Sequence, residues 1–133
     1  MRRWIAPAVI ALTGAVLAAV ADSVTALVVC LLGAVLVSPL VFPFPLTDAM
    51  ARDRSAKDGR AIIYWRPGCP FCLRLRFALL GRRAHWVDIW RDPGAAAAVR
   101  AVADGNETVP TVILAGAAYV NPDPRWLRGA LAY

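Results

Sequence analysis

Two cysteines separated by two residues, Cys69 and Cys72, are the residues of this chain best suited to chemistry. They follow a β-branched and aromatic run at 61–65 and precede a helical pattern, so we expect them at the start of a helix. Unpaired backbone N–H groups and the helix dipole favour an anion there, which predicts a stabilised thiolate at Cys69. Cys72 lies one turn further and is expected to be the resolving thiol. Arg66 is a second, cationic source of stabilisation.

Two structural explanations of these cysteines fit less well. A structural zinc site normally needs four ligands, whereas residues 47–133 offer only Cys69, Cys72 and His85 as thiols or imidazole. No metal is therefore expected, and His85 is assigned a structural role in a strand. A structural disulfide is disfavoured because a cytoplasmic environment reduces such bonds. Thiol–disulfide chemistry remains the preferred interpretation.

The elements around the cysteines alternate between strands and helices. Strands are predicted at 61–65, 84–90, 111–114 and 117–120. Helices are predicted at about 71–79, about 93–103, and from 121–124 to the end of the chain. The order β-α-β-α-β-β-α predicts an α/β domain over residues 61–133 with a four-stranded mixed sheet. Its first two strands should be parallel and its last two antiparallel. Residues 47–60 are polar and are predicted to form a juxtamembrane linker or short helix.

Residues 1–46 have a very different composition, with Arg2, Arg3 and Asp22 as their only charged residues. The whole chain is 59% hydrophobic, above the roughly 45–50% of an ordinary soluble protein. One helix over this stretch would be about twice the hydrocarbon thickness of about 30 Å. A transmembrane helical hairpin is therefore predicted, with helices at about 4–20 and 23–42. This composition excludes a purely soluble protein, a disordered chain and a disulfide-rich secreted module.

The distribution of charge predicts an orientation for this hairpin. Arg2 and Arg3 precede it, basic residues follow it between 52 and 60, and the turn carries no positive charge. Both ends should therefore face the cytoplasm, which places residues 47–133 at the cytoplasmic side of the cell membrane, with lipid as a partner. The alternative is a signal peptide cleaved after Ala21. The net charge of +6 does not indicate nucleic-acid binding, because no basic stripe with interleaved aromatic residues is present.

Four stretches of the C-terminal half carry a family resemblance. They are Tyr-Trp-Arg-Pro-Gly-Cys-Pro-Phe-Cys (64–72), Val-Asp-Ile-Trp-Arg-Asp-Pro (87–93), Gly-Asn-Glu-Thr-Val-Pro-Thr-Val (105–112) and Asn-Pro (121–122). With them, residues 61–133 resemble a glutaredoxin, and specifically the mycoredoxin branch; residues 1–46 have no part in the resemblance. The resemblance implies a thioredoxin-like fold and a thiol–disulfide oxidoreductase.

The resemblance also implies which residues bind substrate. Pro110 matches the cis-proline that faces the cysteines in thioredoxin-like folds and leaves the backbone of Val109 free to pair with an extended disulfide substrate. Arg66 matches a basic residue that holds a carboxylate of the low-molecular-weight thiol. The other implied contacts to this thiol are Pro70, Phe71 and Thr108. No bound cofactor is implied.

The identity of the thiol follows from one departure from the family pattern. Glutathione-using glutaredoxins have a Gly-Gly-x-Asp stretch where this chain has Asn121-Pro122-Asp123. We therefore expect mycothiol, rather than glutathione, as the electron source. The main hypothesis is a membrane-anchored enzyme that reduces mixed disulfides of this thiol, protein disulfides, or both. The alternatives are a non-catalytic membrane adaptor and a dedicated electron donor to a membrane enzyme.

Overall fold

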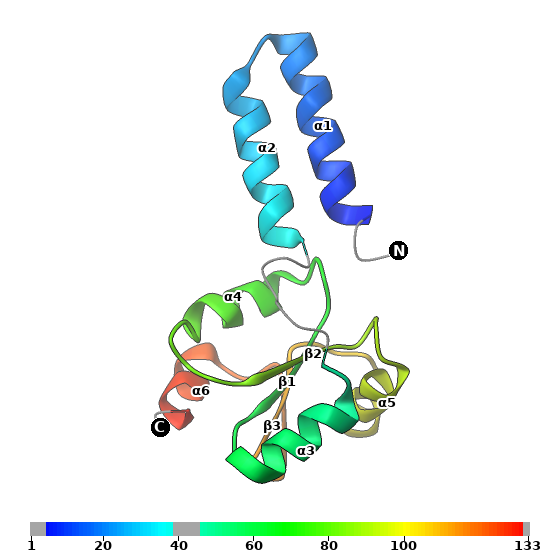
Figure 1. The fold of residues 1–133 in the computed structure, drawn as a ribbon, viewed down its shortest axis with the longest axis vertical. Helices are drawn as coiled ribbons and strands as arrows, with labels where there is room; N and C mark the ends of the chain where they lie inside the picture. Colours follow the sequence, from blue (N-terminus) through cyan, green and yellow to red (C-terminus); the bar gives the residue numbers. More distant parts are fainter. Residues whose placement is uncertain (1–4, 39–45, 132–133) are drawn as a thin grey trace. The chain divides into compact units, whose positions relative to one another are not determined.

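The computed structural model describes residues 5–38 and 46–131 in two compact units, Met1–Phe44 and Pro45–Tyr133 (Figure 1). The first unit contains α1 (Ile5–Ala21) and α2 (Val24–Val37). The helices of the second unit are α3 (Asp48–Asp58), α4 (Pro70–Ala78), α5 (Pro93–Val102) and α6 (Pro124–Ala130). Its strands are β1 (Ile62–Trp65), β2 (His85–Asp88), β3 (Thr111–Leu114) and β4 (Ala117–Val120).

The first unit is a helical hairpin whose turn lies at the predicted position. Asp22 adopts a φ of 46°, and the Ser23 side chain caps α2 by accepting the N–H of Ala26 at 3.3 Å. The two helices approach closely at Gly14, where an added Cβ would lie 2.3 Å from the Cβ of Cys30. Gly14 and Cys30 thus form one close contact between the two helices.

The expectation that these helices span a membrane is not supported. In the ranges 5–38 and 46–131, no helix combines the length and the apolar character that a membrane crossing requires. α1 has 17 residues and α2 has 14. At about 1.5 Å per residue these lengths are about 26 and 21 Å, short of a hydrocarbon core of about 30 Å. The helix ends predicted at residues 4 and 42 lie outside the described residues.

The second unit is built on the predicted mixed sheet, with strand order β2-β1-β3-β4. β1 pairs in parallel with β2, Ile62 opposite His85, and antiparallel with β3. β3 and β4 form an antiparallel hairpin around Ala115 and Gly116, which both have positive φ. Every residue of the central strand β1 is buried, as its β-branched and aromatic composition predicts.

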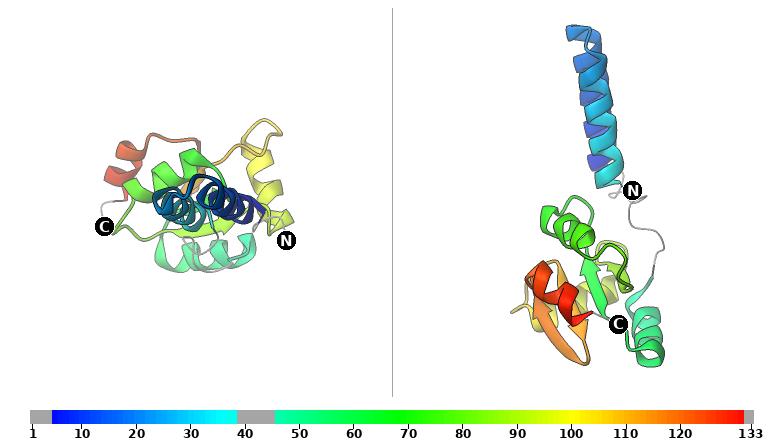
Figure 2. Two further views of the ribbon diagram at one scale, coloured as in Figure 1. Left: turned by 90° about the horizontal axis from the view of Figure 1, so that it is seen from above. Right: turned by 90° about the vertical axis from the view of Figure 1, so that its left-hand side faces the viewer.

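Helices cover both faces of this sheet. α4 and α6 pack together on one face, and α3 and α5 pack together on the other (Figures 1 and 2). The core between these layers contains fully buried apolar side chains from strands and helices: Ile63, Leu75, Val87, Val99, Val112 and Leu127. Burial of each large aliphatic side chain contributes about 1.5–3 kcal/mol, so this layer packing holds the loops at the ends of β1 and α4 in place.

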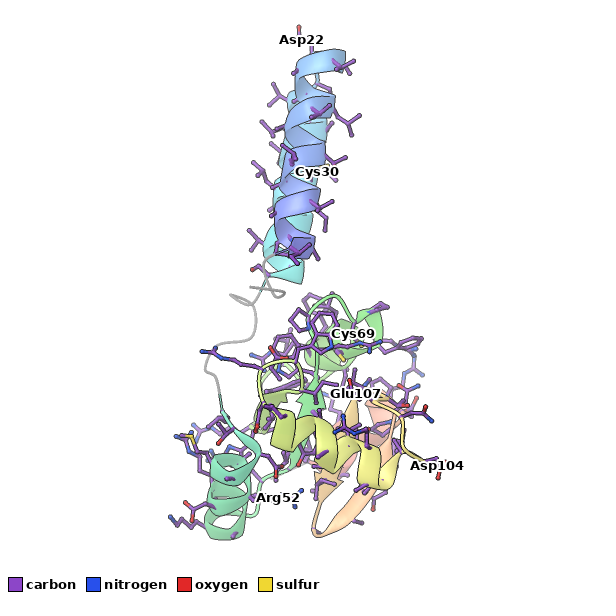
Figure 3. The ribbon with its side chains drawn as sticks, turned by 90° about the vertical axis from the view of Figure 1, so that its right-hand side faces the viewer. Asp22, Cys30, Arg52, Cys69, Asp104 and Glu107 are labelled. Atoms are coloured by element: carbon purple, nitrogen blue, oxygen red, sulfur yellow. The ribbon has the colours of Figure 1, made fainter. Side chains whose placement is uncertain are left out.

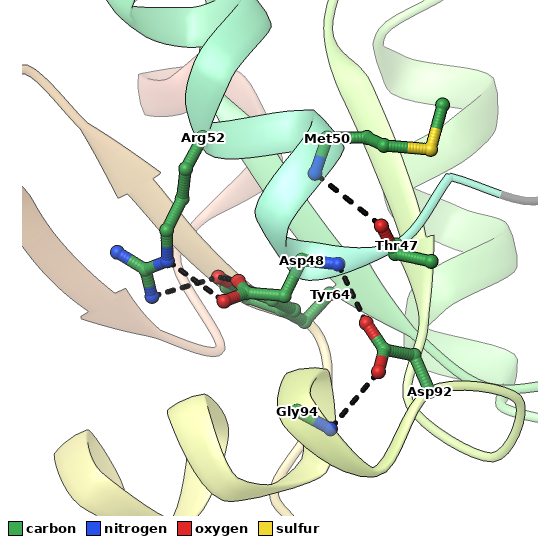
Figure 4. A network of polar contacts seen from close by, with 7 residues as sticks. All are labelled: Thr47, Asp48, Met50, Arg52, Tyr64, Asp92 and Gly94. Carbon is green, nitrogen blue, oxygen red and sulfur yellow. Dashed lines mark hydrogen bonds and ion pairs between the residues drawn. The ribbon is translucent and has the colours of Figure 1, made fainter.

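Residues 47–60, predicted as a linker or short helix, form α3 and pack against the sheet. The hydroxyl of Tyr64 in β1 donates to Asp48 Oδ1, and the guanidinium of Arg52 donates to the same hydroxyl at 3.3 Å (Figure 4). The N–H of Asp48 donates to Asp92 Oδ2 at 2.6 Å, which connects α3 to the cap of α5. Burial and the Asp48 carboxylate raise the pKa of Tyr64, so the phenol stays protonated and donates. α3 is therefore part of the second unit.

The second strand is shorter than predicted and ends at Asp88. Asp88 Oδ1 accepts the N–H of Trp90 at 2.9 Å, and this local turn removes Trp90 from the strand. His85, at the start of β2, is 7% exposed and its Nε2 lies 2.9 Å from Asp58 Oδ2. The structural role predicted for His85 agrees with this placement, where it connects β2 to the end of α3.

Candidate functional site

The loop between β1 and α4 places Cys69 at the N-terminus of a helix. Gly68 adopts a φ of 80°, a conformation that favours glycine, and the chain then turns into α4. Cys69 is the N-cap residue, and Pro70 occupies the first turn, where a missing N–H costs nothing. The N–H of Cys72 donates to Cys69 Sγ at 3.2 Å. The sulfur therefore takes the place of the oxygen acceptor that normally caps a helix.

This environment stabilises the thiolate of Cys69. The pKa of Cys69 is lowered from an ordinary 9.0 to about 6, and the largest cause is the hydrogen bond that the Cys72 thiol donates to its sulfur. Burial acts in the opposite direction, whereas the backbone N–H groups of Cys72 and Phe71 and the charge of Arg66 contribute to the lowering. Cys69 is thus mostly ionised near neutral pH, which is the form that attacks disulfides.

Cys72 has the opposite properties. It is 1% exposed, and its hydrogen bond to Cys69 together with its burial raises its pKa above the ordinary value. Its thiol therefore keeps its proton and serves as a donor to the neighbouring sulfur. Both cysteines are free, so the structure represents the reduced pair. The two sulfurs therefore differ in protonation: Cys69 favours the thiolate, and Cys72 keeps its proton.

A second segment faces Cys69 from the start of β3. The Val109–Pro110 peptide is cis, as the resemblance implied for Pro110. The carbonyl oxygen of Val109 lies 3.6 Å from Cys69 Sγ, a distance at which the protonated thiol can donate to it. The carbonyl of Thr108 accepts the hydroxyl of Thr111 at 2.8 Å, which fixes the turn before the strand. Residues 108–110 thus lie next to the cysteines in space, although about 40 positions of the chain separate the two segments.

An open cavity of about 490 Å³ gives access to the reactive sulfur. Cys69 itself is only 5% exposed, but it lines this cavity and is therefore not walled off from a ligand. The predicted site residues that line the same cavity are Arg66, Pro70, Phe71, Thr108 and Val109. Cys72 is buried and lines neither this cavity nor the neighbouring one that is described next. The cavity therefore leaves space for another molecule directly beside Cys69.

A neighbouring cavity of about 280 Å³ extends the site. Pro110 lines this second cavity rather than the first, together with Arg74 and the Asn121–Pro124 segment. Phe71, 54% exposed, and Asn121 line both cavities. The two cavities are therefore adjacent, and Phe71 stands at their boundary.

Four residues of the first cavity were not assigned to the site from the sequence: Gly68, Asn106, Glu107 and Asn121. Asn106 and Glu107 precede Thr108 within the 105–112 motif, so the motif itself was a signal for them. Asn121 was noted only as a departure from the family pattern. Within residues 5–38 and 46–131 there is no group of three or more His, Cys, Asp or Glu side chains that could hold a metal ion.

Comparison with known proteins covers the same part of the chain. A family model described as glutaredoxin matches residues 61–118. Two Mycobacterium tuberculosis proteins named as glutaredoxins, from strains CDC 1551 / Oshkosh and ATCC 25618 / H37Rv, are each 44% identical to this chain over 63 residues. The aligned region covers 45% of this chain and 75% of each relative.

Proposed function

Because this chain belongs to the glutaredoxin family and is a thiol–disulfide oxidoreductase, we propose that Cys69 is its nucleophile and Cys72 its resolving thiol. The observation that carries this proposal is the pairing of a low-pKa sulfur in an open cavity with a buried, protonated one beside it. An incoming disulfide can reach Cys69 through the cavity, whereas Cys72 is buried and lines neither of the two cavities. The order of the two steps follows from this difference in access.

In the first step, the Cys69 thiolate attacks one sulfur of the substrate disulfide. A bond forms between that sulfur and Cys69 as the substrate S–S bond breaks, and the departing thiolate takes a proton from water. Cys69 is then uncharged. Its sulfur no longer accepts the Cys72 hydrogen bond and its charge no longer opposes Cys72 ionisation, two of the causes that raise the Cys72 pKa. The pKa of Cys72 therefore falls at the step where its thiolate is needed.

In the second step, the Cys72 thiolate attacks Cys69 and expels the bound group as a thiolate. Two electrons have then passed from the dithiol to the substrate, and the enzyme holds a Cys69–Cys72 disulfide. Two molecules of a low-molecular-weight thiol regenerate the dithiol and leave joined as their own disulfide. In a monothiol route, one molecule of this thiol replaces Cys72 as the attacking group and leaves as a disulfide with the group bound to Cys69. We propose mycothiol for this role, supported by Asn121-Pro122-Asp123 in place of a Gly-Gly-x-Asp stretch. Arg66, Phe71 and Thr108 would contact this thiol in the cavity.

Steady-state reduction of a peptide mixed disulfide by the full-length chain in detergent tests the proposal. Cys69→Ser should abolish turnover, whereas Cys72→Ser should keep monothiol turnover and accumulate a mixed disulfide that mass spectrometry detects. Mycothiol, glutathione and thioredoxin reductase are supplied as alternative electron sources to identify the reductant. Turnover by Cys69→Ser at the wild-type rate would refute the assignment of the nucleophile.

We also propose that the α1–α2 hairpin anchors the enzyme to the cell membrane through lipid contact, with the redox domain in the cytoplasm. The support is the apolar character of the exposed side chains along both helices. Those most exposed are Leu12, Val20, Val24, Val29 and Leu32, each at least 60% accessible. A helix that is apolar on all its faces needs an apolar environment around it.

Flotation with liposomes tests this proposal. The full-length chain should float with vesicles, and Leu12→Lys with Val29→Lys should weaken binding because each places a charge on the apolar surface. For orientation, Cys69, Cys72 and Cys30 are replaced by serine, and a single cysteine is introduced at Asp22 or Ser55. An impermeant maleimide should not label Ser55→Cys in whole cells. Absence of vesicle binding, or labelling at Ser55→Cys, would contradict the proposal.

A further inference from the structure

The cavity beside Cys69 contains one acidic side chain that the sulfur chemistry does not use. Glu107 lies in the loop between α5 and β3, directly before Thr108, and lines the cavity together with Cys69 and Arg66. Figure 3 labels Glu107 and Cys69. The Glu107 side chain is 39% exposed, so its carboxylate meets both solvent and any group that enters the cavity.

An ion pair from outside the cavity holds Glu107 in place. Arg100 in α5 donates from Nη1 to Glu107 Oε1 at 2.5 Å, and Arg100 does not belong to the cavity lining. Within residues 46–131, Oε2 of Glu107 accepts no hydrogen bond from protein. Half of the carboxylate is therefore fixed by α5, and the other half is available as an acceptor. A carboxylate offers acceptors only, so it suits a ligand that carries hydroxyl or ammonium donors.

The charge of Glu107 changes what the cavity can attract. Arg66 is the cationic residue of the lining, and Asn106, Thr108 and Asn121 add uncharged polar groups. Without Glu107 the lining would be cationic and would favour a thiol with an excess of carboxylates. With Glu107 the two charges in the lining balance. Net attraction for an anionic ligand is weakened, although Arg100 partly neutralises Glu107, and hydrogen bonding to an uncharged polar ligand is increased.

We propose that Glu107 is a specificity-determining residue: it favours an uncharged, hydroxyl-rich thiol and disfavours a thiol that carries an excess of carboxylates. This inference rests on the proposed function, in which the cavity holds a low-molecular-weight thiol attached to the sulfur that Cys69 attacks. Glu107 acts on the group beside that sulfur and takes no part in bond exchange. Substitution of Glu107 should therefore change the ratio of activities towards two thiols without changing the pKa of Cys69.

The test compares two mixed disulfides of one peptide, carrying either glutathione, which has an excess of carboxylates, or mycothiol, which is uncharged and hydroxyl-rich. kcat/KM is measured for both with the full-length chain in detergent. Glu107→Gln should raise the glutathione-to-mycothiol ratio about fivefold, equivalent to about 1 kcal/mol, as expected for one partly exposed charge. Asp104→Asn is the matched control. Asp104 lies on the same loop, carries the same charge, is exposed, and lies outside the cavity lining (Figure 3).

A second variant should move the ratio in the opposite direction. Arg100→Gln leaves Glu107 charged but removes the cation that partly neutralises it, so the glutathione-to-mycothiol ratio should fall. The pH midpoint of Cys69 alkylation should stay at about 6 in both variants. A purely structural role for the ion pair would make the two variants change the ratio in the same direction.

Three results would overturn the inference. The first is an equal change in the ratio for Glu107→Gln and Asp104→Asn, which would indicate a general charge effect. The second is a change of kcat/KM by the same factor for both substrates in Glu107→Gln. The third is no change in either value of kcat/KM. If wild-type protein reduces neither mixed disulfide, the proposed function itself fails. That outcome differs from one in which the wild type reduces the substrates but Glu107→Gln leaves the glutathione-to-mycothiol ratio unaltered.

Discussion

Replacement of Cys72 by alanine should raise the pKa of Cys69, because the Cys72 thiol is the largest cause of its low value. Alanine removes the S–H donor but keeps the backbone N–H that donates to Cys69 Sγ at 3.2 Å. Serine is the matched control, since its hydroxyl still donates from nearly the same position. The comparison of the two variants therefore isolates the side-chain hydrogen bond from the helix N-terminus.

The size of the effect follows from the strength of one hydrogen bond to a charged group, about 1.5–3 kcal/mol. At about 1.36 kcal/mol per pKa unit, this corresponds to roughly one to two units. The Cys69 pKa should therefore move from about 6 to between about 7 and 8 in Cys72→Ala. The Cys72→Ser variant should remain closer to the wild-type value.

The assay is the pH dependence of iodoacetamide alkylation, followed by mass spectrometry. A Cys30→Ala background removes the remaining thiol. A rate at one pH would conceal the effect: at pH 7 a pKa of about 7.5 lowers the thiolate fraction from about nine-tenths to about a quarter. The more basic thiolate is also more nucleophilic, by a Brønsted slope of about 0.4–0.5, and over about 1.5 pKa units this gain offsets the whole of the loss. The midpoint of the profile is therefore the quantity to measure.

A midpoint of about 6 in Cys72→Ala would refute the reasoning, because the backbone donors and Arg66 would then be enough to keep the pKa of Cys69 low. Equal upward shifts in Cys72→Ala and Cys72→Ser would also contradict it, since serine retains a donor. The midpoint of Cys72→Ser is expected to lie between those of the wild type and Cys72→Ala.

Three further outcomes are expected. Gly14→Ala should loosen the α1–α2 hairpin and lower its thermal stability, because the new Cβ would lie 2.3 Å from another Cβ; Gly33→Ala, with 3.9 Å to its nearest atom, should have little effect in the same melting experiment. Tyr64→Phe should lower the free energy of unfolding by about 1–3 kcal/mol in urea titrations, since it leaves Asp48 without its buried donor. The lowered pKa of Cys69 stabilises the folded, reduced protein above the unfolded pKa of about 8.5, and this contribution disappears as the pH falls through about 6. Urea titrations of reduced wild type should therefore show a gain from about pH 6 to about pH 8 that Cys69→Ser lacks, and parallel curves would contradict this linkage.

Local patterns were enough to predict the succession of elements in the second unit. Asp92 and Pro93 begin α5, and the β-branched run at Ile62 and Ile63 forms the buried central strand, as their types indicated. The end of β2 was wrong by two residues, because a side-chain turn at Asp88 competes with strand pairing. The role of residues 47–60 was also open, since their polar sequence has no strong apolar period.

For the site, the sequence predicted Cys69 and Cys72, because the properties expected of them depend on a helix terminus only a few residues away. It did not identify Glu107 or Asn106 as cavity residues, because a loop residue's neighbours depend on where the rest of the chain brings it. For the hairpin, the sequence placed the turn next to Asp22, and the helix ends that it predicted at residues 4 and 42 stay predictions.

The amino-acid sequence by itself determined which sulfur should be reactive and which strands should alternate with which helices, because capping, turn chemistry and hydrophobic periodicity act over a few residues. Only the tertiary structure decided what surrounds that sulfur. The antiparallel pairing of β3 with β1 brings Val109 to Cys69 and Glu107 to the cavity that Cys69 lines, and α3 joins the sheet through Asp48 and Tyr64. These contacts join segments far apart in the chain, and they form only when the shared core is buried.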